Sequence, residues 1–166
     1  MTNRASETQA PKDVFEAIRT LLAVRSYQDK PVPDTVIRRI VEAGRLTGSG
    51  MNGQPWHFIV VRDAETLRRL GALASSGPYV AQAPLAIVVA TDKTRFAVSD
   101  ASRAIQSMLL TAWADGVGSN WVGFGGLEKV QGVARHPGRP RCVGDPSVWL
   151  PDSNPDKRQE AAQAAA

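Results

Sequence analysis

Apolar residues recur at three- and four-residue spacing in several stretches of the chain, as they do along helices that bury one face. The first stretch follows Asp13, a residue type that caps helices, and we expect it to end near Arg25 with its apolar face buried. Asp34 is expected to cap a second helix, and the helical pattern restarts at Asp63. The longest pattern covers residues 97–115 and ends at two glycines, which favour helix termination.

Three short runs have the composition of strands. Trp56 to Val61 is aromatic and β-branched and follows a proline. Pro84 to Thr91 is apolar on both faces, so we expect it at the centre of the sheet. Ser119 to Phe124 is a third run, and Leu127 to Val133 adds one or two turns of helix. The patterns predict an α+β fold with helices packed on a central sheet.

The two ends of the chain differ from this middle part. Residues 1–12 are polar and are predicted to form a disordered tail. Residues 13–133 are predicted to form one domain. Five of the 11 prolines lie between Pro137 and Pro155, and no apolar period survives there. Residues 134–166 are therefore predicted to be irregular.

Composition excludes several classes of protein. The chain has 166 residues, 43% of them hydrophobic, which suits one globular domain. Its net charge is +4, but the basic residues are scattered, which argues against nucleic-acid binding. Cys142 is the one cysteine, so no internal disulfide forms, and nothing resembles a metal cluster. No apolar run is long enough to span a membrane, so we expect a soluble, cytoplasmic protein.

Residues 48–58 form a turn-rich stretch with polar side chains directly before a strand. Three glycines let the backbone turn and approach a ligand, and three polar residues offer donors and acceptors. The glycines are Gly48, Gly50 and Gly53, and the polar residues are Ser49, Asn52 and Gln54. An ordinary helix-to-strand connection has a similar composition, so this stretch alone leaves two interpretations open.

Two further segments give this stretch a context. The first is Val24-Arg25-Ser26-Tyr27 with the following Asp29 to Val32, and the other runs from Asp100 to Phe124 through Trp121-Val122-Gly123. Together with Ser49 to Phe58, in this order and spacing, they resemble the nitroreductase family of FMN-dependent flavoproteins that use NAD(P)H. The resemblance covers roughly residues 13–133, and it implies a central, mostly antiparallel sheet flanked by helices.

The resemblance implies a set of cofactor-binding residues. Arg25 matches a basic position that grips the FMN phosphate, as a guanidinium does well. Ser49, Asn52 and Gln54 match flavin contacts, Met51 an apolar contact, and Gly123 a place where the main chain approaches the ring. The predicted set is Arg25, Ser49, Gly50, Met51, Asn52, Gln54 and Gly123. The alternatives are a solvated Arg25 at a helix end and an ordinary Gly123 at a strand end.

In this family the flavin performs the bond-making step. Hydride arrives from NAD(P)H and leaves to a nitroaromatic, quinone or similar acceptor, so no catalytic side chain is predicted. The resemblance also implies a homodimer, with residues 49–54 reaching the flavin from the partner. We expect Trp56 and Trp113 to be core or interface residues, and His57 to be a packed, hydrogen-bonded residue rather than an acid or base.

The chain departs from the resemblance in two places. Many relatives have Arg and Ser where Leu21 and Ala23 stand, which weakens phosphate binding. Relatives also end with a Gly-Ile-Pro turn, a hydrophobic strand, Gly-Tyr-Pro and a basic segment. Codons permitted for residues 135–137 and 147–151 encode Gly-Ile-Pro and Pro-Phe-Gly-Tyr-Pro one base later, so we hypothesise a reading-frame shift between about Gln131 and Ala134. The final strand is then missing or altered, and the rival functions are a non-catalytic flavin-binding protein or an inactive relative.

Overall fold

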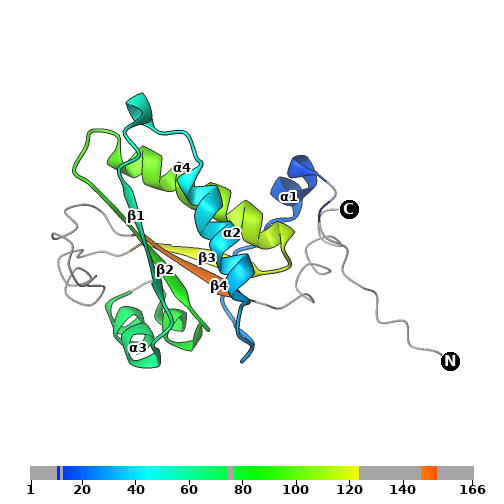
Figure 1. Ribbon diagram of the computed structural model, residues 1–166. Helices are drawn as coiled ribbons and strands as arrows, with labels where there is room; N and C mark the ends of the chain where they lie inside the picture. Colours follow the sequence, from blue (N-terminus) through cyan, green and yellow to red (C-terminus); the bar gives the residue numbers. More distant parts are fainter. Residues whose placement is uncertain (1–10, 12, 75–76, 124–146, 153–166) are drawn as a thin grey trace.

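The computed structural model describes residues 11, 13–74, 77–123 and 147–152. They form one four-stranded sheet with helices against both faces (Figure 1). The helices are α1 (Val14–Thr20), α2 (Asp34–Arg45), α3 (Ala64–Leu73) and α4 (Ala97–Ala114), with short 3₁₀ turns η1 (Gly50–Asn52) and η2 (Pro78–Gln82). The strands are β1 (Trp56–Val61), β2 (Ala86–Thr91), β3 (Gly118–Gly123) and β4 (Ser147–Asp152). The α+β prediction is confirmed.

Every pair of neighbouring strands in the sheet is antiparallel, and the strand order is β1-β2-β4-β3. Beyond β3, Ala23 forms an isolated parallel bridge with Ser119. All six residues of β2 are buried, as predicted for the centre of the sheet. Their side chains alternate between the two faces, so both faces of this strand must be apolar.

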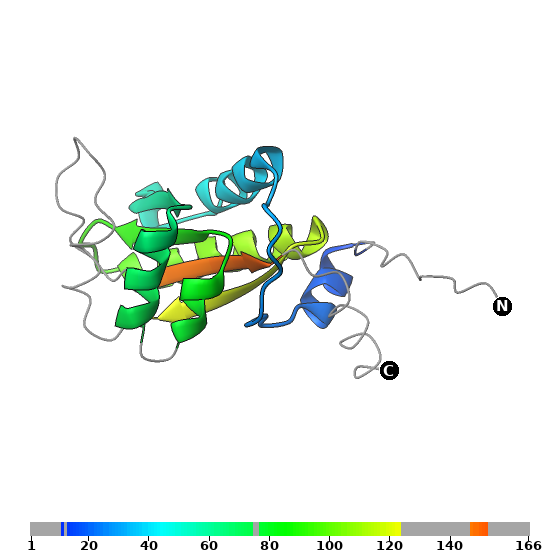
Figure 2. The same ribbon diagram turned by 90° about the horizontal axis from the view of Figure 1, so that it is seen from below.

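Two layers of helices cover the two faces of the sheet. α2 and α4 pack on one face around Ile87 and Val89, whereas α3 and η2 pack on the other around Ala86 and Val88. Figure 2 shows α1 beside one end of the sheet, away from α3. α2 and α4 approach closely, since a Cβ on Gly44 would come within 2.9 Å of Met108 Sδ. The two helices therefore pack closely in one layer.

The predicted helix starts are correct in two cases and wrong in one. Asp13 accepts a hydrogen bond from Glu16 N at 2.8 Å, and Asp63 accepts one from Thr66 N at 2.8 Å. Asp34 is instead the first residue of α2, where Pro33 occupies the cap position and no side chain caps the helix. The Asp34 carboxylate pairs instead with Arg62, the residue directly after β1.

The expectation that the first helix buries its apolar face is wrong for the single chain. α1 ends at Thr20, earlier than predicted, and buries Ala17 and Thr20. Val14, Phe15 and Ile18 remain 71%, 73% and 55% exposed. The apolar surface of α1 is wider than its contact with α4, so part of it stays in solvent.

A strand lies inside the segment that was predicted to be irregular. Ser147–Asp152 forms β4 and pairs with β2 on one side and β3 on the other. The run Ser-Val-Trp-Leu has strand composition, but Pro146 and Pro151 flank it and obscure the pattern. Opposite Pro151 lies Ser119, whose carbonyl accepts a hydrogen bond from Val24 N at 3.0 Å. The predicted helix at residues 127–133 lies outside the described residues. So do residues 1–10 and 12 of the predicted N-terminal tail, and residues 134–146 and 153–166 of the predicted irregular segment.

Candidate functional site

The predicted flavin loop, residues 48–54, connects α2 to β1 and lies against the start of α4 (Figure 1). Thr47 precedes it, and its hydroxyl lies 2.8 Å from Ser107 Oγ on α4. Gly50 N donates a hydrogen bond to Asp100 Oδ1 at 3.0 Å. Two polar contacts therefore attach this connection to one helix.

The loop backbone is strained at three residues that are not glycine. Met51, Asn52 and Gln54 have φ angles of 52°, 55° and 46°. This left-handed region is unfavourable for residues with a Cβ, most of all outside Asn and Asp. Strain of this kind persists where neighbouring contacts determine the conformation, and it is concentrated at functional sites.

Three hydrogen bonds inside the loop fix its backbone. Asn52 N donates to Ser49 O at 3.1 Å, and Gly53 N donates to Gly50 O at 3.0 Å. Gln54 N donates to Ser49 Oγ at 2.9 Å. The Ser49 hydroxyl therefore supports the loop in addition to any contact with a ligand.

The tip of the loop presents the predicted side chains to solvent. Gln54 Nε2 donates to Asn52 Oδ1 at 3.1 Å, so the two amide groups form a pair. Met51 is 93% exposed, an unusual state for an apolar side chain. The structure thus brings Ser49, Asn52 and Gln54 together and places Met51 beside them.

Phe96, at the cap position of α4, forms the wall behind the loop. A Cβ on Gly50 would lie 2.5 Å from Phe96 Cδ2, so the ring packs directly against this glycine. Arg95 lies over the same ring at 4.6 Å from its centroid. A second basic group is close, because a Cβ on Gly48 would lie 3.3 Å from the guanidinium of Arg103. The loop therefore has an aromatic wall and a basic neighbour.

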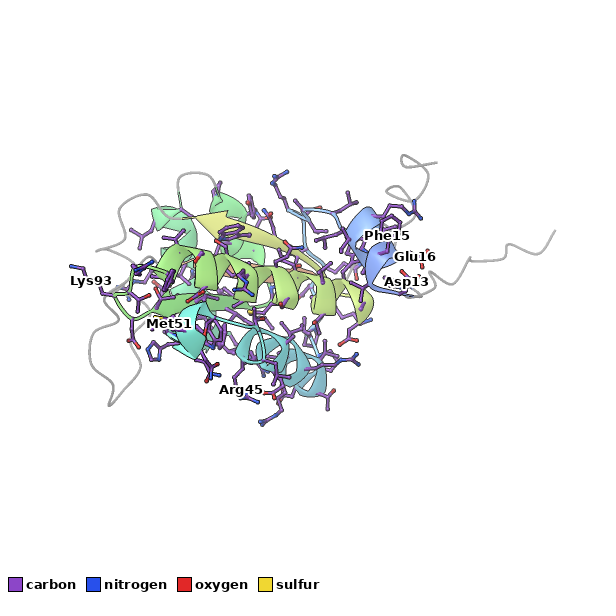
Figure 3. All side chains as sticks on the ribbon, turned by 90° about the horizontal axis from the view of Figure 1, so that it is seen from above. Asp13, Phe15, Glu16, Arg45, Met51 and Lys93 are labelled. Atoms are coloured by element: carbon purple, nitrogen blue, oxygen red, sulfur yellow. The ribbon has the colours of Figure 1, made fainter. Side chains whose placement is uncertain are left out.

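Arg25 lies far from this loop in the same chain. The preceding residue, Val24, donates its N–H to Ser119 at the start of β3, beside the end of α4 that holds α1. The loop contacts α4 at Asp100, whereas α1 contacts it at Trp113. Thirteen residues of helix separate these two contacts, a rise of about 20 Å. Figure 3 shows Met51 and Phe15 at opposite ends of α4.

Gly123 ends β3, the strand that starts beside Val24. It is exposed, and a Cβ at this position would meet no atom of the described residues within 4 Å. Four residue steps along β3 separate Ser119 from Gly123, about 13 Å in a strand. Arg25 and Gly123 thus border the same edge of the sheet, whereas the loop leads into the opposite edge strand, β1.

The predicted aromatic and histidine roles match the structure. Trp56 and Trp113 are 7% and 1% exposed and belong to the core. His57 Nε2 lies 3.0 Å from Asp92 Oδ1, so the imidazole has a hydrogen-bonded partner. This pair lies directly after the loop, since Asp92 N donates to Pro55 O at 2.8 Å.

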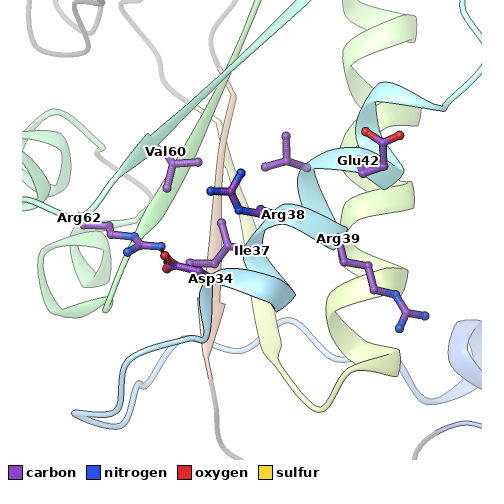
Figure 4. A pocket seen from close by; sticks show the side chains of 8 residues that line it. Asp34, Ile37, Arg38, Arg39, Glu42, Val60 and Arg62 are labelled. Carbon is purple, nitrogen blue, oxygen red and sulfur yellow. Dashed lines mark hydrogen bonds and ion pairs between the residues drawn. The ribbon is translucent and has the colours of Figure 1, made fainter.

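A groove between α2 and β1 is a second surface feature (Figure 4). Ile37, Val41 and Val60 supply its apolar part. Its charges are largely balanced, because Arg62 pairs with Asp34 and Arg39 lies 3.3 Å from Asp115. The hydrogen bond from Arg62, with its positive charge, lowers the pKa of Asp34 below its ordinary value. None of the predicted cofactor residues lines the groove.

Asp100 and Phe96 are residues that the sequence interpretation did not assign to the site. Asp100 is 2% exposed and lies on the same buried stripe of α4 as Ala101 and Ala104. An acidic residue on an apolar stripe is a recognisable signal, because a buried carboxylate needs a hydrogen-bond donor. The donor, Gly50 N–H, is distant in sequence and was not predictable from the helix pattern.

Neither a cluster of metal ligands nor a membrane-spanning helix is present in residues 11, 13–74, 77–123 and 147–152. Among these residues, no group of three or more His, Cys, Asp and Glu is placed to hold a metal ion. No described helix has both the length and the hydropathy required to cross a bilayer.

Comparisons with known proteins place these features in a family. The family model described as "Nitroreductase family" matches residues 19–94 and 75–144. A protein of Methanothermobacter thermautotrophicus, named as an NADH dehydrogenase/NAD(P)H nitroreductase, is 40% identical over 129 residues, covering 74% of this chain and 68% of the relative.

Solved structures give the same result. A Desulfovibrio desulfuricans nitroreductase in complex with FMN is 31% identical with a TM-score of 0.73, covering 84% of this chain and 85% of that chain. An NADH dehydrogenase/NAD(P)H nitroreductase from Bacteroides thetaiotaomicron is 28% identical with a TM-score of 0.76, over 84% and 85% of the two chains. With its fold, its loop and these matches in agreement, the chain belongs to the nitroreductase family.

Proposed function

We propose that the protein is an FMN-dependent oxidoreductase that takes hydride from NAD(P)H and passes it to a nitroaromatic, quinone or similar small acceptor. The observation that carries the proposal is the strained loop at residues 49–54, whose amide side chains are presented to solvent beside an exposed Met51. The Desulfovibrio desulfuricans relative in complex with FMN supports the choice of cofactor.

The residues of this chain fit FMN in two groups. Arg25 is an exposed cation suited to a phosphate, and Gly123 leaves space at the other end of β3. FMN carries its phosphate and its ring at opposite ends of an extended chain, which suits a strand's length between the two residues. Asn52 and Gln54 supply neutral donors and acceptors for the ring edge.

The separation of these groups supports a homodimer. Arg25 and the loop lie near opposite ends of α4, so one small cofactor does not reach both in the same chain. A partner related by two-fold symmetry brings its loop to the Arg25 side of the first chain, and the exchange occurs twice. The exposed apolar side chains of α1 and Met51 are suited to burial at such an interface.

When bound, FMN supplies the electron-accepting ring through which hydride passes. The protein's part is to bind, orient and exclude water. In our proposal Arg25 fixes the phosphate, the loop amides hold the ring edge, and Met51 covers an apolar part of the site. No side chain is assigned to proton transfer. A cytoplasmic location, where NAD(P)H is supplied, completes the proposal.

Two rival functions make different predictions for the purified protein. A non-catalytic flavin-binding protein retains FMN but does not oxidise NADH or NADPH. An inactive relative with an altered C-terminal segment retains no FMN. The altered segment begins in residues outside the described part of the chain, so the loop and Arg25 alone do not separate these cases.

One set of measurements tests the proposal. Purified protein is supplied with FMN, desalted and examined by absorbance, and NADH and NADPH oxidation is then followed with a nitroaromatic and a quinone. We expect nearly one FMN per chain, turnover with at least one donor and acceptor, and a dimer by sedimentation. Flavin bands without turnover would indicate the binding protein. No retained flavin would refute the proposal.

A further inference from the structure

Asp100 is a charged residue in an apolar part of the molecule. Its side chain belongs to a residue that is 2% exposed, among the core residues Ala101 and Ala104 of α4. Burying a carboxylate is unfavourable unless hydrogen bonds compensate for the lost water. Here Gly50 N–H donates to Asp100 Oδ1 at 3.0 Å. The buried carboxylate therefore forms its hydrogen bond with the loop that precedes β1.

The contact with Asp100 occurs where the loop enters its strained part. Gly50 immediately precedes Met51 and Asn52, which both have positive φ, and Gln54 follows with the same conformation. The loop's other hydrogen bonds, from Asn52 N, Gly53 N and Gln54 N, stay within residues 49–54. They shape the loop but do not attach it to the rest of the protein.

Gly50 is held from two directions. Asp100 accepts its N–H, and the ring of Phe96 fills the space that a side chain would need. The other polar attachment to α4, between Thr47 and Ser107, lies before the loop turns. Within the described residues, Asp100 is therefore the charged side chain that fixes the strained segment to the helix.

We infer that Asp100 is a positioning residue of the cofactor site: its carboxylate anchors Gly50 and so holds Asn52 and Gln54 where they meet the flavin. The inference rests on the proposed function. Asp100 itself is too deeply buried to contact a ligand. Its effect passes through the Gly50 amide and the short turn to the paired side-chain amides of Gln54 and Asn52.

The test compares three variants of the full chain. Asp100→Ala removes the acceptor, and Asp100→Asn keeps an oxygen in its place. Ala101→Gly is the matched control, because it weakens the same turn of α4 through lower helix propensity without touching Gly50. FMN affinity is measured by fluorescence titration. Amide hydrogen exchange of Gly50 is measured separately in the FMN-free protein.

Asp100→Ala removes the hydrogen bond between the carboxylate and Gly50 N–H, so we expect it to weaken FMN binding about tenfold or more. Amide hydrogen exchange at Gly50 should become faster by a similar factor. Asp100→Asn should remain within about threefold of the parent protein, since it keeps an acceptor. Unchanged affinity and protection in Asp100→Ala, an equal loss in Ala101→Gly, or an equal loss in Asp100→Asn would each overturn the inference.

The exchange measurement separates this inference from the proposed function. If the unaltered protein binds no FMN, the proposed function fails. Faster exchange confined to residues 50–54 in Asp100→Ala would still support Asp100 as the anchor of the loop. Unaltered exchange there would reject the anchor whether or not FMN binds.

Discussion

The two ends of α4 differ in how far the rest of the chain covers them. At its start, the loop is attached by the Gly50–Asp100 and Thr47–Ser107 contacts and packs on Phe96, so its shape is determined within one chain. At its other end, Trp113 Nε1 donates to Thr20 Oγ1 at 2.9 Å, but α1 leaves Val14 and Phe15 in solvent. The start of α4 therefore carries a well-ordered polar loop. The other end of α4 carries an apolar surface that the single chain does not cover. In the proposed homodimer, the loop serves the partner's site, and the α1 end of each chain receives the partner's loop.

Trp113→Ala should have the largest effect, because it removes a core side chain that is 1% exposed and its hydrogen bond to Thr20. Truncating a buried Trp costs roughly 3–5 kcal/mol of unfolding free energy. Urea denaturation of the FMN-free protein measures this loss of unfolding free energy. Trp121→Ala is the control: this residue is 45% exposed, so we expect about 1 kcal/mol or less. Equal losses of unfolding free energy in the two variants would contradict the core role assigned to Trp113.

Phe15→Glu tests whether the exposed face of α1 is an interface. Phe15 is 73% exposed in the chain, so its replacement should leave the fold of the protomer intact. A charge placed in a buried interface should weaken the dimer at least about tenfold, as judged by sedimentation over a range of concentrations. Arg19→Ala changes a polar neighbour on the same helix and should leave the association constant unchanged. A Phe15→Glu protein that remains a dimer would remove α1 from the interface.

Gly50→Ala probes the opposite end of α4. The new Cβ would lie 2.5 Å from Phe96 Cδ2, so the loop or the ring must shift. Overpacking of this kind should weaken FMN binding about tenfold while the dimer persists. Gly53→Ala is the matched control, because its Cβ would meet Gly50 O at 3.3 Å and its φ is −71°. The structural account of the loop fails if Gly53→Ala is the more damaging change.

The smallest effect is expected at Asp63, remote from both ends of α4. Hydrogen bonds from the Thr66 hydroxyl and N–H lower its pKa below the ordinary value. A lowered pKa in the folded state adds stability above the ordinary pKa, near 4, and this stability disappears as pH falls through the folded value. Asp63→Ala should therefore be slightly less stable than the parent at pH 7 and converge with it at acid pH. A difference that grows toward acid pH would contradict this assignment.

Local patterns predicted the parts of the fold that local chemistry determines. Trp56–Val61 forms β1, as its aromatic and β-branched composition predicted, and α3 begins directly after Asp63, where the helical pattern was predicted to restart. The loop residues were identified by a motif, and the structure brings their side chains together.

The misses came from partners that are distant in sequence. Asp34 pairs with Arg62 rather than capping α2, and the buried Asp100 accepts a hydrogen bond from Gly50. The periodicity of the sequence shows that α1 has an apolar face. It does not show which part of the protein covers that face, so the exposure of α1 could not be predicted. β4 was missed because its prolines resemble those of a loop, whereas its position between β2 and β3 depends on long-range pairing.

The C-terminal segment contributes a strand to the sheet, so the prediction that it is irregular needs revision. β4 occupies an interior place in the sheet, so the described residues include a strand where a missing one was expected. The family match extends to residue 144, beyond the proposed frame shift between Gln131 and Ala134. The shift remains our proposal for residues 135–137 and 147–151. Sequencing the gene tests it, because codons that do not read as Gly-Ile-Pro and Gly-Tyr-Pro one base later would exclude it.

The distance between Arg25 and the loop has a genetic consequence. If each site takes Arg25 from one chain and Asn52 from the other, Arg25→Ala and Asn52→Ala proteins are each defective in both sites of their own dimers. Mixed dimers contain one doubly altered site and one that is intact. Random pairing of equal amounts makes roughly a quarter of all sites intact. Two inactive genes expressed together would then restore activity, as complementing alleles do.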